Sequence, residues 1–353
     1  MEVYWIWLSR LKHIGPVLQK QLIEHFSSPK DVFEAIEDDL KLVPKITKTA
    51  IKSILTKRCL KEAENILNDA EKSGVGILLF NSEHYPNFAR ESKQSPIVLY
   101  YRGELQPLQT TVGVVGARRC TPYGRKIAKQ IGEELAARNI PVISGFAKGI
   151  DSYAQVACIR KGGYTIAFLG CGPDICYPPE QRILYQEILE KGGAFLSQYP
   201  PGTPPAPKHF LARNALISAW STELVIVEAG EQSGALWTAD FSIKNKKTVY
   251  AVPNRIDCQE GMGTNRLLEQ GIPPYLGIQS LQAAKQNREH PITQQPKNAT
   301  PNSPILQLLS DTPVTIQQLS KQLHLEAAEI MDQLFELEMK KEIIVRGNVV
   351  YRS

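Results

Sequence analysis

The sequence predicts an α/β fold: a Rossmann-like, doubly wound and mostly parallel sheet, with a helical module before it and a winged-helix domain after it. Between residues 112 and 280, short apolar runs alternate with helical stretches. The chain is also too long for one ordinary domain, at 353 residues. We expect a helical module over 1–72, the Rossmann-like domain over 73–284 with an extended lead-in over 73–111, a linker over 285–303 and a winged helix over 304–353.

The composition indicates a cytoplasmic globular protein. The six cysteines form no CxxC pair and have no histidine at zinc-ligand spacing, so we expect reduced thiols and no metal. The first eleven residues are apolar but too short for a membrane span, and they lack a signal-peptide cleavage pattern. A net charge of +5 is only a weak argument for nucleic acid, although the excess is greatest in residues 112–280, with 18 Lys and Arg against 14 Asp and Glu.

Residues 1–70 show apolar side chains at helical spacing, as in Leu18, Leu22 and Phe26. Two connectors, His13–Pro16 and Val43–Thr47, resemble halves of a helix-hairpin-helix repeat, which presents backbone N–H groups to phosphate. DNA contact and a packing or partner-binding role both stay open here, and the second is favoured.

The lead-in contains two predicted strands, Val75–Phe80 and Ile97–Tyr101, which we expect to form a hairpin or an edge addition to the sheet. The core strands are then predicted at Val112–Val115, Ile140–Ile143, Thr165–Leu169, Ala194–Leu196, Glu223–Val227 and Thr248–Val252. Because the carboxyl ends of parallel strands share one edge of a sheet, the loops that follow them should form a ligand-binding groove.

The loop after the first core strand has the features of a phosphate site. Gly116 allows a tight turn, Arg118 and Arg119 add positive charge, and Thr121 is a predicted N-cap before a proline. The positive end of the next helix should therefore face an anion. Dinucleotide binding is disfavoured, since the G-x-G-x-x-G pattern is absent and Ser144-Gly145 stands where a ribose-binding acid would fall.

The second loop, SGFAKGID, places Lys148 before Gly149 and predicts Asp151 as the N-cap of the next helix. Further along, Lys208, Phe210, Arg213 and Asn214 combine charge, a ring and an amide, a mixture that suits single-stranded nucleic acid. A core position for Phe210 stays open as an alternative.

The loop after the fifth core strand offers Ser233 and Gly234 at a helix N-terminus, a second predicted anion site. Glu228, at the end of that strand, is predicted to orient a sugar hydroxyl or an arginine. As a catalytic acid it lacks a partner in the sequence. A nucleotide-binding or nucleotide-hydrolysing enzyme or sensor is therefore the alternative to a binding protein.

The ordered motifs GARRCTPYG, SGFAKGID, TIAFLGCGPDICYPPE, LSQYPPG, KHFLARN, VEAGEQSGALWTA and AVPNR resemble the DNA-processing protein A (DprA, or Smf) family. The resemblance implies a non-catalytic, homodimeric, single-stranded-DNA-binding protein that protects incoming DNA and helps to load the RecA recombinase in natural transformation. It also implies a sterile-alpha-motif-like N-terminal module. No cofactor is expected. The predicted binding residues are Gly116, Arg118, Arg119, Thr121, Ser144, Gly145, Lys148, Gly149, Lys208, Phe210, Arg213, Asn214, Ser233 and Gly234, supported by Asp151 and Glu228.

The chain departs from the family pattern at Gln155, Gln198, Ala215 and Asn254, which predicts fewer polar groups in the groove. The winged helix is predicted to contain three helices and a hairpin, at Ile305–Leu309, Thr315–Leu323 and Glu326–Lys340 and at Ile343–Val345 with Val349–Tyr351. The third of these helices is rich in carboxylates. Negative charge facing phosphates is unfavourable, so we expect this domain to bind a protein rather than duplex DNA.

Overall fold

An eight-stranded sheet forms the core, in the order β1-β2-β6-β5-β4-β3-β7-β8. Strands β3 to β8 run parallel, and β2 joins β6 antiparallel with β1 at the edge. The strands are β1 (Gly76–Leu79), β2 (Val98–Gly103), β3 (Val112–Val115), β4 (Val142–Ser144), β5 (Thr165–Phe168), β6 (Ala194–Ser197), β7 (Glu223–Ile226) and β8 (Thr248–Ala251). The predicted doubly wound, mostly parallel sheet and the edge addition by the lead-in are confirmed.

The structure is a computed structural model and describes residues 1–286, 305, 308–309, 314–323, 330, 334, 337, 343–346 and 349–352. The chain divides into two units, Met1–His290 and Pro291–Ser353. The predicted boundaries at residues 72, 284 and 303 stay predictions.

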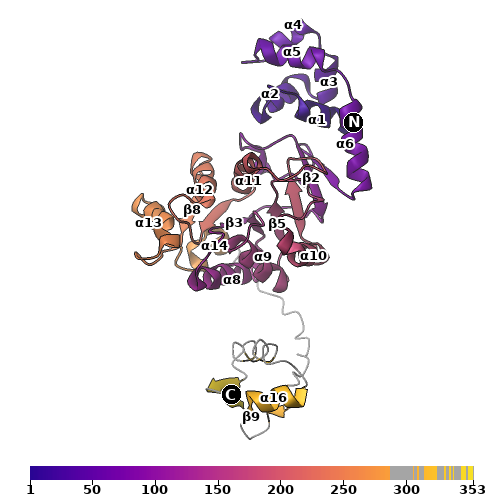
Figure 1. The fold of residues 1–353 in the computed structure, drawn as a ribbon. Coiled ribbons are helices and arrows are strands. Elements are labelled where there is room, and N and C mark those ends of the chain that lie inside the picture. Colours follow the sequence, from indigo (N-terminus) through magenta and orange to yellow (C-terminus); the bar gives the residue numbers. More distant parts are fainter. Residues whose placement is uncertain are drawn as a thin grey trace. The chain divides into compact units, whose positions relative to one another are not determined.

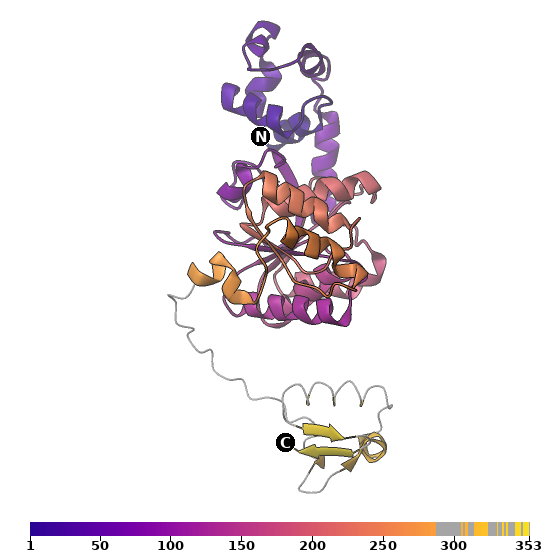
Figure 2. The same cartoon turned by 90° about the vertical axis from the view of Figure 1, so that its left-hand side faces the viewer.

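The direction of chain winding reverses at β3. From β3 the chain proceeds through β4, β5 and β6, and then it returns to add β7 and β8 on the other side of β3. Helices α8 (Pro122–Ala136), α9 (Ile150–Arg160) and α10 (Arg182–Glu190) cover one face, and α11 (Pro207–Ala219) and α12 (Gly234–Lys244) cover the other (Figures 1 and 2). The loops that follow β3 and β7 therefore diverge and leave a crevice between them.

A buried aromatic group anchors α11 to the sheet. Trp220 is fully buried, and its ring lies 5.5 Å from Phe168 of β5 and 5.2 Å from Tyr85 of the lead-in, measured between centroids. Tyr85 stands just before the short helix α7 (Asn87–Arg90). The lead-in segment thus contributes to the main core as well as an edge of the sheet.

The N-terminal module consists of α1 (Glu2–Arg10), α2 (Pro16–Phe26), α3 (Pro29–Glu34), α4 (Glu37–Lys41), α5 (Lys48–Thr56) and α6 (Lys61–Lys72). Side-chain caps begin two of these helices, because Ser28 accepts a hydrogen bond from the Asp31 N–H and Thr47 from the Ala50 N–H. Their apolar faces share one core with β2, and the helical prediction for residues 1–70 is confirmed. The helix-hairpin-helix resemblance stays a prediction.

After β8, the first unit continues with the helix α13 (Met262–Glu269), the 3-10 turn η3 (Ile278–Ser280) and the helix α14 (Gln282–Gln286). Two further 3-10 turns, η1 (Pro179–Gln181) and η2 (Gln259–Gly261), directly precede α10 and α13.

In the second unit, the described elements are β9 (Val314–Thr315), α16 (Ile316–Leu323), β10 (Ile343–Arg346) and β11 (Val349–Arg352), with sheet order β10-β11-β9. The predicted wing hairpin is present. Thr315 was predicted to be helical and is instead paired with Val349. The acidic helix predicted at Glu326–Lys340 lies almost entirely outside the described residues.

Helices α8 and α9 approach closely at Gly132. A Cβ atom at this position would lie 2.2 Å from the carbonyl oxygen of Ala154. We predict that Gly132→Ala destabilises the fold by about 1–3 kcal/mol, because backbone has to move. Gly234→Ala, where no atom lies within 4 Å of the added Cβ, should leave the urea-unfolding midpoint unchanged. Equal midpoints for the two variants would contradict this account.

Candidate nucleic-acid interface

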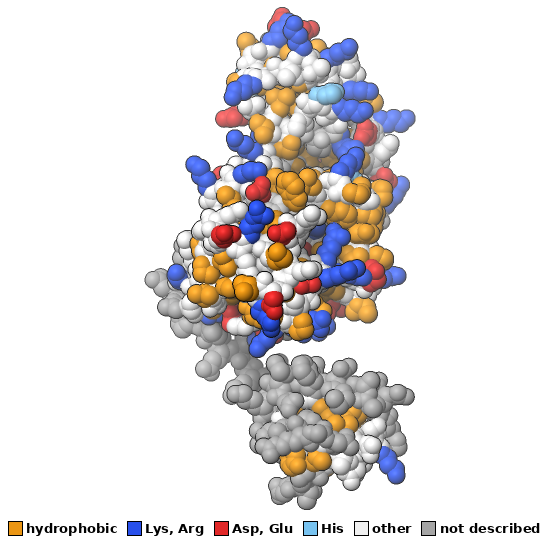
Figure 3. All heavy atoms as spheres, turned by 60° about the vertical axis from the view of Figure 1, so that its left-hand side comes forward, with side chains coloured by type: hydrophobic (Ala, Val, Ile, Leu, Met, Phe, Trp, Pro, Cys, Tyr) orange, Lys and Arg blue, Asp and Glu red, His pale blue; other side chains and the backbone are white. Residues whose placement is uncertain are grey.

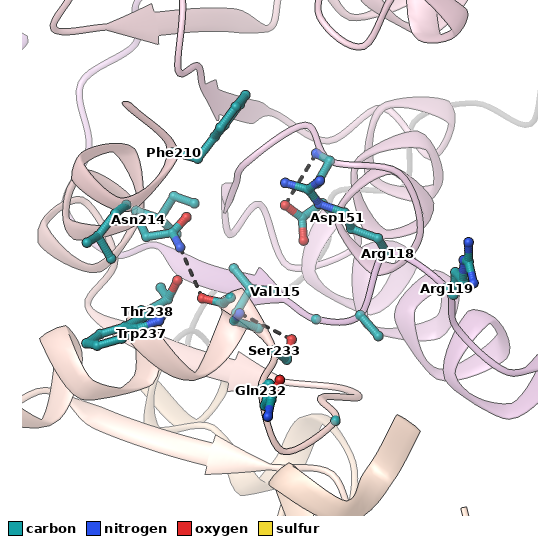
Figure 4. A pocket seen from close by; sticks show the side chains of 18 of the residues that line it. Val115, Arg118, Arg119, Asp151, Phe210, Asn214, Gln232, Ser233, Trp237 and Thr238 are labelled. Atoms are coloured by element: carbon teal, nitrogen blue, oxygen red, sulfur yellow. Dashed lines mark hydrogen bonds between the residues drawn. The ribbon is translucent and has the colours of Figure 1, made fainter. Parts of the chain in front are cut away.

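A cavity of about 660 Å³ lies at the point where the winding reverses, between the loops after β3 and β7. Figure 4 shows Arg118 and Asp151 on one side and Phe210, Asn214 and Trp237 on the other. Nine of the predicted residues line this cavity: Gly116, Arg118, Arg119, Asp151, Phe210, Arg213, Asn214, Ser233 and Gly234. The other predicted residues do not line this cavity.

Gly116 brings the two loops into backbone contact. A Cβ atom here would lie 2.8 Å from the Glu228 carbonyl oxygen, and that oxygen accepts a hydrogen bond of 2.7 Å from the Ala117 N–H. Glycine is therefore required here, because the two loops pack directly on each other. Since it has no side chain, it also takes up no space in the cavity that it lines.

The helix N-terminus of α8 is occupied by a carboxylate of the protein itself. Glu228 is fully buried and accepts hydrogen bonds from the Thr121 N–H, at 2.9 Å, and from the Thr121 hydroxyl. A Cβ atom at Gly124 would lie 2.2 Å from the Glu228 carboxyl carbon, so only glycine fits there. Thr121 is the N-cap, as predicted. The inference of an external phosphate at this helix end is wrong, because an internal anion fills the position.

Glu228 likewise does not line the cavity, and both of its oxygens face Thr121. The predicted role in orienting a sugar hydroxyl or an arginine is therefore replaced by a structural one. The same geometry gives no support to Glu228 as a catalytic acid.

The loop after β4 is held by a buried pair of opposite charges. Asp151 and Arg213 are each 5% exposed. The Asp151 carboxylate accepts from the N–H groups of Gly145 and Ala147, at 3.1 and 3.4 Å. Arg213 donates to the carbonyls of Gly145 and, at 3.0 Å, Phe168. These bonds tie α11 to the loop after β4 and to the end of β5.

Burial raises the pKa of Asp151 and lowers that of Arg213, while the attraction between the two charges opposes both shifts. Arg213 thus borders the cavity, while its Nε and Nη1 groups donate to Asn214, Gly145 and Phe168 of the surrounding protein. Asp151 was predicted as the N-cap of α9, yet Gly149 occupies that position. Glycine is required at position 149 for two reasons: its φ is +88°, and the Ala117 carbonyl oxygen lies 2.3 Å from where a Cβ would be.

Ser144 is fully buried, and its hydroxyl donates to the Val114 carbonyl at 2.6 Å. Gly145 leaves room for the Arg213 guanidinium, which lies 2.2 Å from where a Cβ would be. Ser144 and Gly145 therefore support the loop structure around the cavity without lining it.

The side chains of Arg118 and Phe210 approach each other at one edge of the cavity. The Arg118 guanidinium is exposed and lies 5.8 Å from the centre of the Phe210 ring. Phe210 is partly exposed and packs over Gly170, where a Cβ would lie 2.8 Å from the ring. Its ring therefore borders the cavity rather than the core.

The opposite wall is the first part of α12. Ser233 caps this helix by accepting from the Ala235 N–H, and no atom lies within 4 Å of a Cβ built at Gly234. Asn214 donates to the Gly234 carbonyl at 3.0 Å and so joins α11 to α12. The backbone at this helix end is open to the cavity.

Trp237 is the exposed aromatic residue of the cavity that the sequence analysis missed. Its side chain is 54% exposed and lines the cavity from α12. The stretch GALWTADFSIK is mainly apolar, so its pattern places the ring in the core. Small residues, Ala235 and Ala239 among them, are buried instead.

Lys148 lies in a neighbouring groove of about 540 Å³, which Arg118 and Arg119 also line. Its ammonium group is 3.0 Å from the Glu180 carboxylate. The N–H of Glu180 itself, and then Lys148, hold the pKa of this carboxyl below its usual value. Lys208 is exposed at the start of α11 and lines neither hollow.

The departures from the family pattern do not thin this site. Gln155 is fully buried in α9 and donates to Thr165, and Ala215 is buried in α11. Asn254 donates to the carbonyls of Val227 and Val252 at the ends of β7 and β8. Gln198 is partly buried and donates to the Tyr199 hydroxyl. None of the four side chains lines the cavity, so the expectation that these departures remove polar groups from it is wrong.

Within the part of the chain that the structure describes, no three His, Cys, Asp or Glu side chains gather closely enough to hold a metal ion. The six cysteines are free thiols. No described helix has the length and apolar character needed to cross a membrane.

Comparison with known proteins identifies the family. Residues 76–284 match the family described as DNA recombination-mediator protein A, and residues 289–345 match the DprA winged helix domain. The Smf protein of Synechocystis is 33% identical over 288 residues, covering 80% of this chain and 72% of that protein.

Two solved structures extend this similarity. DNA processing protein A of Streptococcus pneumoniae has a TM-score of 0.65 at 26% identity, over 79% of this chain and 95% of that one. The Helicobacter pylori protein, whose structure was described for its single-stranded DNA binding mode, has a TM-score of 0.53 at 32% identity, over 58% and 93%. On these grounds, the chain belongs to the DNA recombination-mediator protein A (DprA/Smf) family.

Proposed function

We propose that this protein binds single-stranded DNA in the cavity between the β3 and β7 loops. The observation that carries the proposal is the arrangement of two exposed cations, Arg118 and Arg119, and two accessible rings, Phe210 and Trp237, around an open hollow. The cations attract phosphate and the rings stack on bases. The single-stranded DNA binding described for the Helicobacter pylori relative supports the same function.

A single strand fits this arrangement better than a duplex does. Bases of a duplex are stacked on one another, and their faces are not available to Phe210 and Trp237. The bases of a single strand are available, and stacking accepts any base. We therefore expect little sequence preference.

The strand continues past Arg118 into the neighbouring groove in this proposal. Arg118 and Arg119 line both hollows, and Lys148 lies in the second one. The ammonium group of Lys148 has a carboxylate partner in Glu180, which a phosphate would have to replace. Lys148 should therefore contribute less than Arg118.

The finer part of the proposal is that a homodimer protects the strand and delivers it to the RecA recombinase, without catalysis, while the winged helix binds a protein. The family description, a recombination mediator, supports the delivery step. A RecA-loading assay on strands coated with single-stranded-DNA-binding protein tests it, and Arg118→Ala should impair loading.

Arg118→Ala should weaken oligo-dT binding about tenfold and lower the slope of log affinity against log salt by about 0.7, the value for one phosphate contact on a single strand. Lys148→Ala should have a smaller effect. Lys244→Ala is the matched control, because both lysines are exposed and lie 3.0 Å from a carboxylate. An unchanged affinity and slope for Arg118→Ala would refute this pocket.

Trp237→Leu should weaken oligo-dT binding by about 1–3 kcal/mol, because it removes a stacking ring but keeps apolar bulk. Trp237→Phe should retain most of the affinity. The other three tryptophans are buried, so oligo-dT should quench fluorescence from Trp237 alone. Quenching that persists in Trp237→Phe would show that the base does not reach this ring.

Arg213→Met should lower the free energy of unfolding by about 3–5 kcal/mol, because it leaves the Asp151 carboxylate buried without its positive partner. Thermal unfolding measures this effect. Arg118→Ala, whose side chain is exposed, should leave the melting temperature unchanged. A normal melting temperature for Arg213→Met combined with lost DNA binding would instead indicate direct contact by Arg213.

A further inference from the structure

A second basic groove lies on the N-terminal module. Its volume is about 640 Å³, and its walls are the end of α1, the polar face of α5 and the start of α6. None of its residues line the cavity at the switch point. On the face drawn in Figure 3, Lys and Arg side chains of this module outnumber its carboxylates. Because the two hollows share no residue, the groove is a separate candidate site.

The α5 wall is a continuous polar stripe. Thr49, Lys52, Ser53, Thr56 and Lys57 follow one another at helical spacing and all line the groove. The opposite side of the same helix is apolar and buried in the module core. One helix face thus presents alternating ammonium and hydroxyl groups, and both kinds of group bind phosphate oxygens.

Charge is concentrated in this groove. Residues 1–72 contain twelve Lys and Arg against eleven Asp and Glu, so the module as a whole is nearly neutral. The groove itself is lined by Arg10, Lys12, Lys52 and Lys57 against a single carboxylate, Glu62. The ion pair that the structure gives for this groove joins Arg10 Nε to Glu62 Oε1 at 3.3 Å.

The groove is held open by a buried contact. The Trp7 ring is 4% exposed, and its Nε1–H donates to the Lys57 carbonyl at 2.6 Å. This bond fixes the end of α5 against α1 before any ligand arrives. A ligand therefore meets a preformed surface, which lowers the entropy cost of binding.

We propose that this groove binds the sugar-phosphate backbone of duplex DNA. Of the residues that line the groove, Trp7 is buried and the one exposed ring is the small imidazole of His13, so the groove lacks a platform on which successive unpaired bases could stack. Recognition then rests mainly on phosphate, and a duplex has the higher density of phosphate charge. The proposal does not depend on the strand-binding cavity. It adds a duplex contact to a protein proposed to hold a single strand elsewhere.

The test uses the full chain with three lysines of the groove neutralised, Lys12→Gln, Lys52→Gln and Lys57→Gln. The matched control is Lys30→Gln, Lys41→Gln and Lys72→Gln, which removes equal charge from exposed positions of the same module outside the groove. With a blunt fluorescent duplex, the groove variant should bind at least about tenfold more weakly and lose about 3 from the salt slope, at roughly 0.9 per contact. The control should match wild type.

Replacement of the same three lysines by arginine should restore duplex binding, since charge is kept. Oligo-dT binding is measured in parallel, because it reports the cavity and should change far less than duplex binding. Three results would overturn the proposal: duplex affinity of the groove variant within twofold of wild type, an equal loss in the control, or binding of anionic phospholipid vesicles or poly-aspartate without duplex binding. Equal melting temperatures establish that the variants are folded.

Discussion

The reversal of winding at β3 is the constraint on which the rest of this structure depends. Because β4 and β7 are added on opposite sides of β3, the two connecting loops leave the sheet in different directions and cannot cover the strand ends between them. The hollow is then a consequence of topology. What the side chains decide is how close the loops come, and the contact of Gly116 with the Glu228 carbonyl sets that separation.

The two helix N-termini at this hollow have different roles. The end of α8 is neutralised from within, since the buried Glu228 carboxylate accepts both the N–H and the hydroxyl of Thr121. The end of α12 is capped only by its own Ser233, and space beside Gly234 is open. In the proposed function, the positions left open to an anion are therefore the start of α12 and the exposed Arg118, not the helix that directly follows β3.

Charges around the hollow divide into those that build it and those that face solvent. Arg213 and Asp151 are buried and fasten the loop after β4 to the end of β5, whereas Arg118 is exposed beside the Phe210 ring. In the proposed function, loss of binding after mutation therefore has two distinct origins. A buried partner would act through stability, and an exposed cation would act through phosphate contact.

Local patterns in the sequence determined the strands, the helices, the N-cap at Thr121 and the family, because periodicity, capping and motif order are all properties of neighbouring residues. Long-range contacts decided the rest. Thr121 and Glu228 are 107 residues apart in the chain, so no local pattern shows that one neutralises the other. The same holds for Gln155, which points into the core, and for Trp237, whose ring is exposed because the smaller residues of α12 pack against the sheet. Which side of a helix is buried depends on what the fold brings against it, and only the tertiary structure supplies that partner.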